Sequence, residues 1–448
     1  TARDCCSIPI GILTLCQLSV VCADCHALGI PRGLDPQLAC PFRGTRRQSF
    51  ISYIGTYLHC NSVPIIIQLV ITVFQGANSH GQLGLGYVSE QVDKPTKITS
   101  TLWNGVSKIS CGGGHSLLID NEGKLFSCGW NSKNQTGHPE EKYKLERTWC
   151  LSGIKFTNVA CGWDFSCGIT DDNFMFVWGS NSHGQLGLPK EHFQESLKPI
   201  KLQVKACDVS MGLRHSALIS CKGDVWTTGC GKHGQLGLGN DVSESDRFQK
   251  ISSLCNITHI ACGQNHTVAW RSSDRSLFVW GDNKHGQLLL SSDKYRKIFK
   301  PEKIDIDAKS NVKKLLSGWT NVLLWLADGS LLTWGRNNYG QLGTDTPFIG
   351  TLINIKLPGM FPNNINLRLL SFHCKTFLFA DRRQAKDVVL GSEHTVCLAN
   401  DNTLWAWGWN EHANTGVDSA ECVFHPTLVP LENLTNIRAI YSAPANSL

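Results

Sequence analysis

A nine-residue phrase that recurs seven times is the strongest constraint on how this chain of 448 residues can fold. It runs from one glycine to another, in its fullest form as Gly-Ser-Asn-Ser-His-Gly-Gln-Leu-Gly. Successive first glycines are separated by 53, 50, 50, 52, 54 and 73 residues. Repetition at such a period predicts one structural unit that is copied and stacked on its neighbours. The first glycines are Gly76, Gly129, Gly179, Gly229, Gly281, Gly335 and Gly408.

A second phrase alternates with the first along the chain. Its full form is Cys-Gly-x-x-His followed by Ser or Thr, and an apolar run, a short polar turn and another apolar run come after it. Asp120-Asn-Glu-Gly123 is one such turn. Short apolar runs joined by Asn, Asp and Gly turns are typical of β-hairpins. The copies begin at Cys111, Cys161, Met211, Cys262, Ser317 and Leu390, and a degraded seventh copy begins at Ser442.

Seven β-rich units of this size predict an all-β fold, a seven-bladed β-propeller over residues 71–448. The span holds 378 residues, or 54 for each of the seven blades. The first phrase is complete where the repeats start, and the second phrase ends the chain. We therefore expect the ring to be closed by pairing of the N- and C-terminal strands, Ile71–Phe74 with the strand that begins at Asn446. A sheet closed in this way has no exposed edge.

Residues 1–70 carry no repeat and form a Cys-rich leader, with seven of the 20 cysteines. Because the chain starts with Thr, we interpret this leader as a disordered segment or as an artefact of gene-model translation. Its apolar runs, Ile8–Val21 and Val63–Phe74, are too short to cross a bilayer, so no membrane insertion is expected. Cys22-Ala-Asp-Cys25-His26 matches a haem attachment pattern, which we attribute to chance because nothing indicates export.

The later cysteines mostly stand alone beside apolar runs, which is typical of buried thiols in a reducing compartment. We therefore expect a cytoplasmic protein, with the nucleus as a second location. The 42 Lys and Arg residues against 36 Asp and Glu residues give a formal net charge of only +6. Without a strongly basic block, electrostatic capture of nucleic acid is not expected.

Four histidines of the second phrase invite a catalytic or metal-binding hypothesis, but a packing role fits the pattern better. Other copies have Phe165, Asn321 and Asn446 at this position, and a residue that Phe can replace is not a metal ligand. Gly229-Cys-Gly-Lys-His-Gly234 matches a dinucleotide-binding pattern, yet it lies in register with the other repeats and lacks a βαβ context. We therefore expect no catalytic residue, no cofactor and no metal. The four histidines are His115, His215, His266 and His394.

Both phrases resemble the repeats of the regulator of chromosome condensation family, whose members form seven-bladed propellers. The resemblance covers residues 71–448. It implies a protein-binding propeller without bond chemistry of its own, a guanine nucleotide exchange factor or regulator of a small GTPase in protein secretion. The implied partners are a Ran-like or secretory small GTPase and the exocyst or other secretory machinery. An exchange factor binds the nucleotide-free GTPase more tightly than the loaded one, and by linkage it weakens nucleotide binding by the same factor.

The loop positions before the repeat histidine vary from copy to copy, and equivalent loops of a propeller lie on one face. Aromatic and charged residues such as those found here are frequent among interface hot spots. In the family's nuclear member this face holds the GTPase with the help of acidic loop residues, and Asp164 and Glu393 occupy matching positions. We predict a partner-binding face here, with an ordinary solvated rim as the alternative. Its residues are Trp163, Asp164, Arg214, Asn265, Trp319 and Glu393.

Alternatives to exchange activity stay open. Every Gly-Gln-Leu-Gly phrase spans nine residues, so the wedge-like insertion of the nuclear exchange factor is not visible, which favours a non-catalytic adaptor or scaffold. A surplus lies in Thr344–Lys386, where a functional loop and flexible filler are both open. An enzyme, such as a propeller hydrolase or a ubiquitin ligase, is not expected, because no convergent acid, base and nucleophile appear and the chain ends at Leu448 within the last blade.

Overall fold

The computed structural model describes most of the repeat region and four short strands before it. The described residues are 17–20, 58–60, 63–65, 67–70, 72–98, 105–148, 151–190, 199–345, 351–358, 384–418, 421–431, 437 and 439–441. The chain divides into two compact units, Thr1–Thr72 and Val73–Leu448. In the first unit, β1 (Gln17–Val20) pairs antiparallel with β4 (Ile67–Val70). There too, β2 (Leu58–Cys60) pairs antiparallel with β3 (Val63–Ile65).

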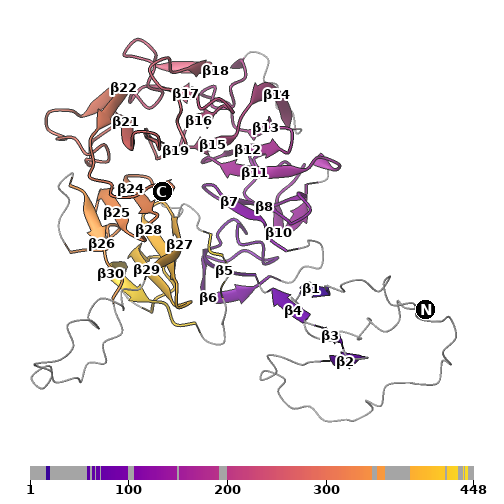
Figure 1. The fold of residues 1–448 in the computed structure, drawn as a ribbon. Coiled ribbons are helices and arrows are strands. Elements are labelled where there is room, and N and C mark those ends of the chain that lie inside the picture. The colour runs from indigo at the N-terminus through magenta and orange to yellow at the C-terminus, as the bar shows by residue number, and fades with distance from the viewer. Residues whose placement is uncertain are drawn as a thin grey trace, which may run out of the picture. The chain divides into compact units, whose positions relative to one another are not determined.

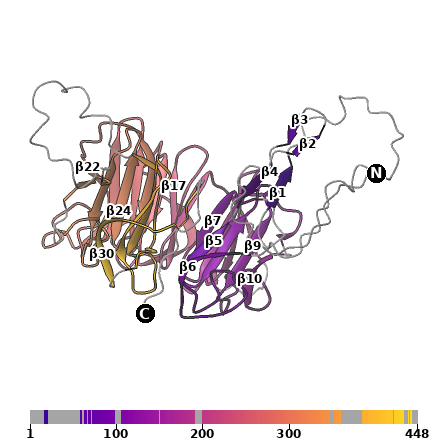
Figure 2. The same cartoon turned by 90° about the horizontal axis from the view of Figure 1, so that it is seen from below.

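The second unit consists of six antiparallel four-stranded sheets and one two-stranded sheet. The strands of each four-stranded sheet are ordered as in the chain, so that sequence neighbours are hydrogen-bonded neighbours. The two-stranded sheet pairs β5 (Val73–Ala77) with β6 (Gln91–Lys97). Figure 1 shows the sheets following one another in a ring, and Figure 2 shows the same strands from below.

The strands of the first three complete sheets are β7 (Lys108–Cys111), β8 (His115–Ile119), β9 (Leu125–Gly129), β10 (Lys142–Arg147); β11 (Phe156–Cys161), β12 (Phe165–Thr170), β13 (Phe174–Gly179), β14 (Ile200–Lys205); and β15 (Asp208–Met211), β16 (His215–Ile219), β17 (Val225–Cys230), β18 (Glu244–Lys250). Those of the last three are β19 (His259–Cys262), β20 (His266–Arg271), β21 (Ser276–Asp282), β22 (Lys297–Ile304); β23 (Val312–Ser317), β24 (Asn321–Leu326), β25 (Leu331–Gly335), β26 (Ile353–Ile355); and β27 (Ala385–Leu390), β28 (His394–Ala399), β29 (Leu404–Trp409), β30 (Cys422–Leu428).

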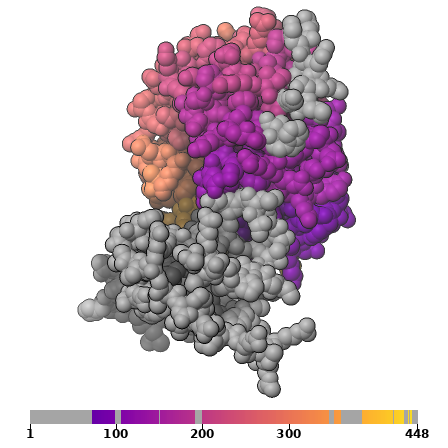
Figure 3. All heavy atoms as spheres, turned by 90° about the vertical axis from the view of Figure 1, so that its right-hand side faces the viewer, coloured from indigo at the N-terminus to yellow at the C-terminus, as the bar shows by residue number. Residues whose placement is uncertain are grey.

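The predicted all-β propeller is confirmed. We number the six four-stranded sheets as blades one to six in chain order, and the β5–β6 sheet precedes them. Figure 3 shows the colours of consecutive blades passing into one another on the visible side of the second unit, as expected when each blade packs on the next. Residues 442–448 lie outside the described residues, so the pairing of Ile71–Phe74 with a strand from Asn446 stays a prediction.

The first blade shows how the sequence sets the predicted hairpins. Gly123 has φ of 81°, a left-handed conformation that glycine adopts without strain, and its N–H donates to the carbonyl of Asp120 at 3.0 Å. The Asp120 carboxylate also accepts from the backbone N–H groups of Glu122 and Lys124. This local turn chemistry sets the register in which β8 pairs with β9, from His115 opposite Gly129 to Ile119 opposite Leu125.

Tryptophans of the third strands join consecutive blades. The indole N–H of Trp178 in blade two donates to the carbonyl of Gln135 in blade one at 2.8 Å. Trp280 makes the same bond to Gln235 at 2.9 Å. Each of these side chains is buried, so the hydrogen bond satisfies a polar group inside an apolar interface. The two further pairs of this kind are Trp334 with Gln287 and Trp407 with Gln341.

The repeat histidines have the packing role that the sequence predicts. His115 and His215 are completely buried, and their Nε2 atoms share hydrogen bonds with hydroxyls of the next blade, Ser166 at 2.8 Å and Thr267 at 3.0 Å. Phe165 fills the same position in blade two and is equally buried. In the described part of the chain, no group of three or more His, Cys, Asp or Glu side chains is arranged to hold a metal ion.

Some of the remaining sequence motifs lie within the described residues and others lie outside them. The Gly229–Gly234 segment leaves β17 and continues into turns rather than a helix, as its repeat register predicts. In the 344–386 surplus, β26 pairs with β25 and completes blade five, whereas residues 359–383 lie outside the described residues. The Cys22–His26 motif also lies outside them. Among the residues that the structure describes, no helix is long and apolar enough to cross a membrane.

Candidate functional site

The loops before the repeat histidine are tied to one another by backbone hydrogen bonds between blades. The N–H of Gly113 donates to the carbonyl of Trp163 at 2.9 Å. In the same way, Gln264 donates to Trp319 at 3.0 Å, and Trp319 donates to Ser392 at 2.9 Å. These bonds connect equivalent loops of neighbouring blades, and equivalent loops of a propeller lie on one side of it, so we call the loops before the repeat histidines the belt.

Trp163 and Trp319 are brought together by the fold although 156 residues separate them. Their ring centroids lie 5.7 Å apart, with an interplanar angle of 50°. The two residues come from blades two and five, which are not neighbours in the ring, so the contact reaches across its centre. Both side chains are half-buried, and they expose part of an aromatic surface on the predicted face. Such surfaces are frequent hot spots of protein interfaces.

Asp164 and Arg214 form a second feature of the face, one blade apart. Burial raises the pKa of Asp164, and a hydrogen bond with Ser180 and the charge of Arg214 act in the opposite direction. Arg214 is exposed, and its guanidinium lies 3.5 Å from Nε2 of His183. The guanidinium is therefore accessible to a partner, whereas the carboxylate is held partly inside the loop.

Asn265 is half-buried and has a partner from the neighbouring phrase. The side-chain amide of Gln235 lies 3.4 Å from its Oδ1 and donates to it. The side-chain amide of Gln341 in blade five makes the same kind of hydrogen bond to the carboxylate of Glu393 in blade six. In both places the Gln of a Gly-Gln-Leu phrase donates a hydrogen bond to the residue directly before the repeat histidine of the following blade. The scaffold thus holds the side chains of this loop position.

Glu393 is placed differently from a free surface carboxylate. Only 4% of it is exposed, and its carboxylate accepts hydrogen bonds from Gln341 and from Thr320, the latter at 3.3 Å. The guanidinium of Arg336 lies 3.9 Å away. Burial raises the pKa of Glu393, while the Arg336 charge opposes this shift. Glu393 therefore lies on the floor of a pocket rather than on the open surface.

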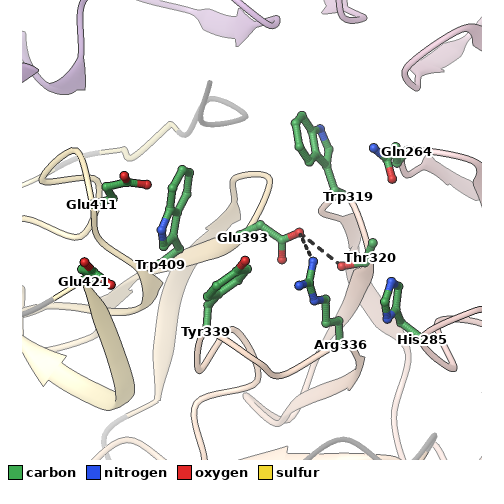
Figure 4. A pocket seen from close by; sticks show the side chains of 10 residues that line it. All are labelled: Gln264, His285, Trp319, Thr320, Arg336, Tyr339, Glu393, Trp409, Glu411 and Glu421. Atoms are coloured by element: carbon green, nitrogen blue, oxygen red, sulfur yellow. Dashed lines mark hydrogen bonds and ion pairs between the residues drawn. The ribbon is translucent and has the colours of Figure 1, made fainter. Parts of the chain in front are cut away.

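This pocket has a volume of about 470 Å³ and lies between blades four, five and six. Figure 4 shows how its side chains are arranged around Glu393. Sequence reasoning predicted Trp319 and Glu393 but missed most of the lining, because it treated the first phrase as scaffold. The signal available was the variation at the second, fourth and fifth positions of that phrase. The lining residues are Gln264, His285, Trp319, Thr320, Arg336, Tyr339, Glu393, Trp409, Glu411 and Glu421.

Comparisons with known proteins agree with the propeller fold. The model of the RCC1-like domain matches residues 72–447, which is most of the chain. The chain belongs to the RCC1-like domain family. One relative is the secretion-regulating guanine nucleotide exchange factor of Mus musculus, which is 32% identical over 381 residues. The match covers 79% of this chain and 77% of the relative.

Solved structures support the fold of this RCC1-like chain. Human WBSCR16 superimposes with a TM-score of 0.69 at 21% identity, over 84% of this chain and 97% of that one. Prp20p from Saccharomyces cerevisiae superimposes with a TM-score of 0.66 at 20% identity, over 81% and 86%. At these identities the agreement concerns the arrangement of blades and not the binding residues.

Proposed function

We propose that this RCC1-like chain is a protein-binding propeller that regulates a small GTPase, as a guanine nucleotide exchange factor in protein secretion. The observation that carries the proposal is its similarity to a secretion-regulating guanine nucleotide exchange factor over more than three quarters of both chains. The proposed site of action is the cytoplasm, with the nucleus as a second location, and the exocyst or other secretory machinery is a further proposed partner.

The proposed docking surface is the belt of loops before the repeat histidines. The Trp163–Trp319 pair supplies aromatic area near the centre of the ring, and Arg214 supplies an accessible charge. Asp164 and Asn265 complete the surface, and Glu393 shapes its pocket. No bond is made or broken by such a protein. Its effect on the GTPase follows from binding the nucleotide-free state more tightly than the loaded state.

We also propose that the β5–β6 sheet is the core of a seventh blade closed by the C-terminal residues. Gln75 on β5 donates from Nε2 to the carbonyl of Ala413 in blade six at 3.0 Å. On the other side, Ser116 of blade one donates to the carbonyl of Gln82 at 2.7 Å. The Tyr441 hydroxyl donates to the carbonyl of Ser107 at 3.3 Å. These contacts support a ring position between the sixth and first blades, and deletion of residues 442–448 should lower the melting temperature.

An adaptor without exchange activity is the second candidate, and one observation favours it. In the described phrases the backbone closes two consecutive turns, as where Gly81 donates to Asn78 and Gly84 donates to Gly81, each at 3.0 Å. The same two bonds recur in blade three, from Gly234 to Gly231 and from Gly237 to Gly234. Within these described phrases no wedge-like insertion protrudes, which favours the adaptor.

Release of fluorescent GDP from a panel of Ran-type and secretory small GTPases tests the proposal with the full chain. Exchange activity predicts faster release from at least one GTPase, and Trp163→Ala should reduce that rate at a temperature well below the melting temperature of the variant. Unchanged release from every GTPase, with binding retained in a pull-down of the same proteins, would leave the adaptor. Unchanged release without binding to any of them would refute the role in GTPase regulation.

A further inference from the structure

The pocket at blades four to six combines an aromatic wall with uncompensated negative charge. Tyr339 and Trp409 lie with ring centroids 6.2 Å apart, and Trp319 lines the same pocket. Figure 4 shows Glu411 and Glu421 beside Trp409, on the side of Tyr339 that faces away from Arg336. Aromatic faces carry negative electrostatic potential and attract cations, so the wall and the carboxylates favour the same kind of ligand.

The two outer carboxylates are available for a ligand. Glu411 and Glu421 are both exposed, and neither forms an ion pair with another described residue. The third carboxylate of the pocket, Glu393, is already opposed by Arg336 at 3.9 Å. Counting one cation against three carboxylates leaves the lining with a formal charge of −2 while His285 is neutral. Burial and the Arg336 charge both lower the pKa of His285, which keeps it neutral at pH 7.

The protein itself already places a guanidinium in this environment. The guanidinium carbon of Arg336 lies 4.8 Å from the centroid of the Tyr339 ring, within the range of a cation–π contact. The same group faces the Glu393 carboxylate. Arg336 therefore occupies one end of the pocket, and the other end, with Trp409, Glu411 and Glu421, has no Lys or Arg among the residues that line it.

We propose that this pocket binds an arginine side chain presented by a partner protein. The planar guanidinium of that arginine contacts the aromatic wall and donates hydrogen bonds to the carboxylates of Glu411 and Glu421. Arginine fits better than lysine, because its fork of N–H groups can serve two carboxylates while its flat face lies on a ring. The inference does not depend on the partner being a GTPase, since it assigns the pocket by chemistry alone.

Titration of the full chain, labelled with 5-fluorotryptophan, with the peptide acetyl-Gly-Arg-Gly-amide tests the proposal by ¹⁹F NMR. The Trp409 resonance, assigned from Trp409→Phe, should shift and saturate. The matched peptide with citrulline in place of arginine keeps the shape and lacks the charge, so it should leave this resonance in place. Other tryptophans, such as the buried Trp280 of blade four, should not respond to either peptide.

Variants of the two outer carboxylates provide the second arm. Glu411→Gln combined with Glu421→Gln should weaken binding of the arginine peptide by about fivefold or more, as loss of two partly screened charge pairs implies. Glu302→Gln removes an exposed carboxylate on β22 and should leave binding unchanged. Equal shifts with the citrulline peptide, no saturation at 50-fold molar excess over about 1 mM protein, or tighter binding of a lysine peptide would each overturn the assignment.

Discussion

Acid should destabilise this protein through the buried repeat histidines. Burial lowers the pKa of His115 and His266 to about 3, and that of His215 and His394 to about 4. In the unfolded chain the same groups titrate near 6.5. Below that pH the unfolded state therefore binds more protons than the folded state. The contribution of these histidines to stability is complete above pH 6.5 and is lost progressively as the pH falls.

The size of the effect follows from the pKa differences. Between pH 7 and pH 5.5 each buried histidine lowers the free energy of unfolding by about 1.3 kcal/mol, because its protonation is confined to the unfolded chain over this range. The four together account for about 5 kcal/mol, a large part of the stability of an ordinary domain. Replacing His215 with Phe should reduce this loss to about 4 kcal/mol, since Phe occupies the same position in blade two.

The reverse exchange provides the matched variant. Phe165→His adds a fifth histidine at the repeat position. Its expected hydrogen-bond partner is the Ser216 hydroxyl of blade three, which is equivalent to the Ser166 hydroxyl that pairs with His115. The loss between pH 7 and pH 5.5 should then rise to about 6 kcal/mol. Urea unfolding followed by tryptophan fluorescence at the two pH values measures all three proteins. An unchanged loss in both variants would show that the native histidines accept protons in place, and the reasoning would fail.

Four further substitutions test the packing of the blades and the predicted partner-binding face separately. Gly129→Ala should cost more than 2 kcal/mol in urea unfolding, because φ is 100° and a Cβ would lie 2.4 Å from the Gly114 carbonyl, whereas Gly153→Ala, with φ of 89° and no atom within 4 Å, should cost about 1 kcal/mol. Trp280→Phe should cost about 1–3 kcal/mol in the same assay, because the buried Gln235 carbonyl loses the indole N–H and keeps only the Thr267 hydroxyl as donor. Asp164→Ala should weaken partner binding in a pull-down without lowering the melting temperature, and loss of both would show a structural role.

The propeller could be predicted because its units are local and repeated. A turn such as Asp120–Gly123 is specified by residues within a few positions, and it recurs with the same chemistry in other copies. The structural role of the histidines was also predictable, since Phe165 at the equivalent position excludes a function that only imidazole supplies. The copies within one chain can thus be compared with one another, and they show which residue types each repeat position accepts.

The pocket could not be predicted for the opposite reason. Glu393 is buried by Gln341, 52 residues earlier in the chain, and by Arg336 of the same copy. No pattern within one copy shows which residues of the preceding blade will cover a loop position. From the sequence, Glu393 is therefore predicted to be an exposed carboxylate. The packing of blade five on blade six buries it at the floor of the pocket. Trp409 and Glu411 were missed because they stand inside a phrase whose glycines indicate scaffold.

Equivalent positions of different blades also contact one another. Equivalent residues of the first strands meet in a ring, as Asn158 donates to Asp208 at 3.1 Å and Lys314 pairs with Asp387. The repeated backbone thus places equivalent residues of different blades at the same height in the ring. A substitution in one blade therefore changes the side chain that a residue of another blade contacts. Trp163 and Trp319 are such a case, because they stand at one position of copies two and five and contact each other across the centre. The Trp163 ring also lies against Gly113 of blade one, so this pair takes part in the packing of the loops as well as in the proposed docking surface.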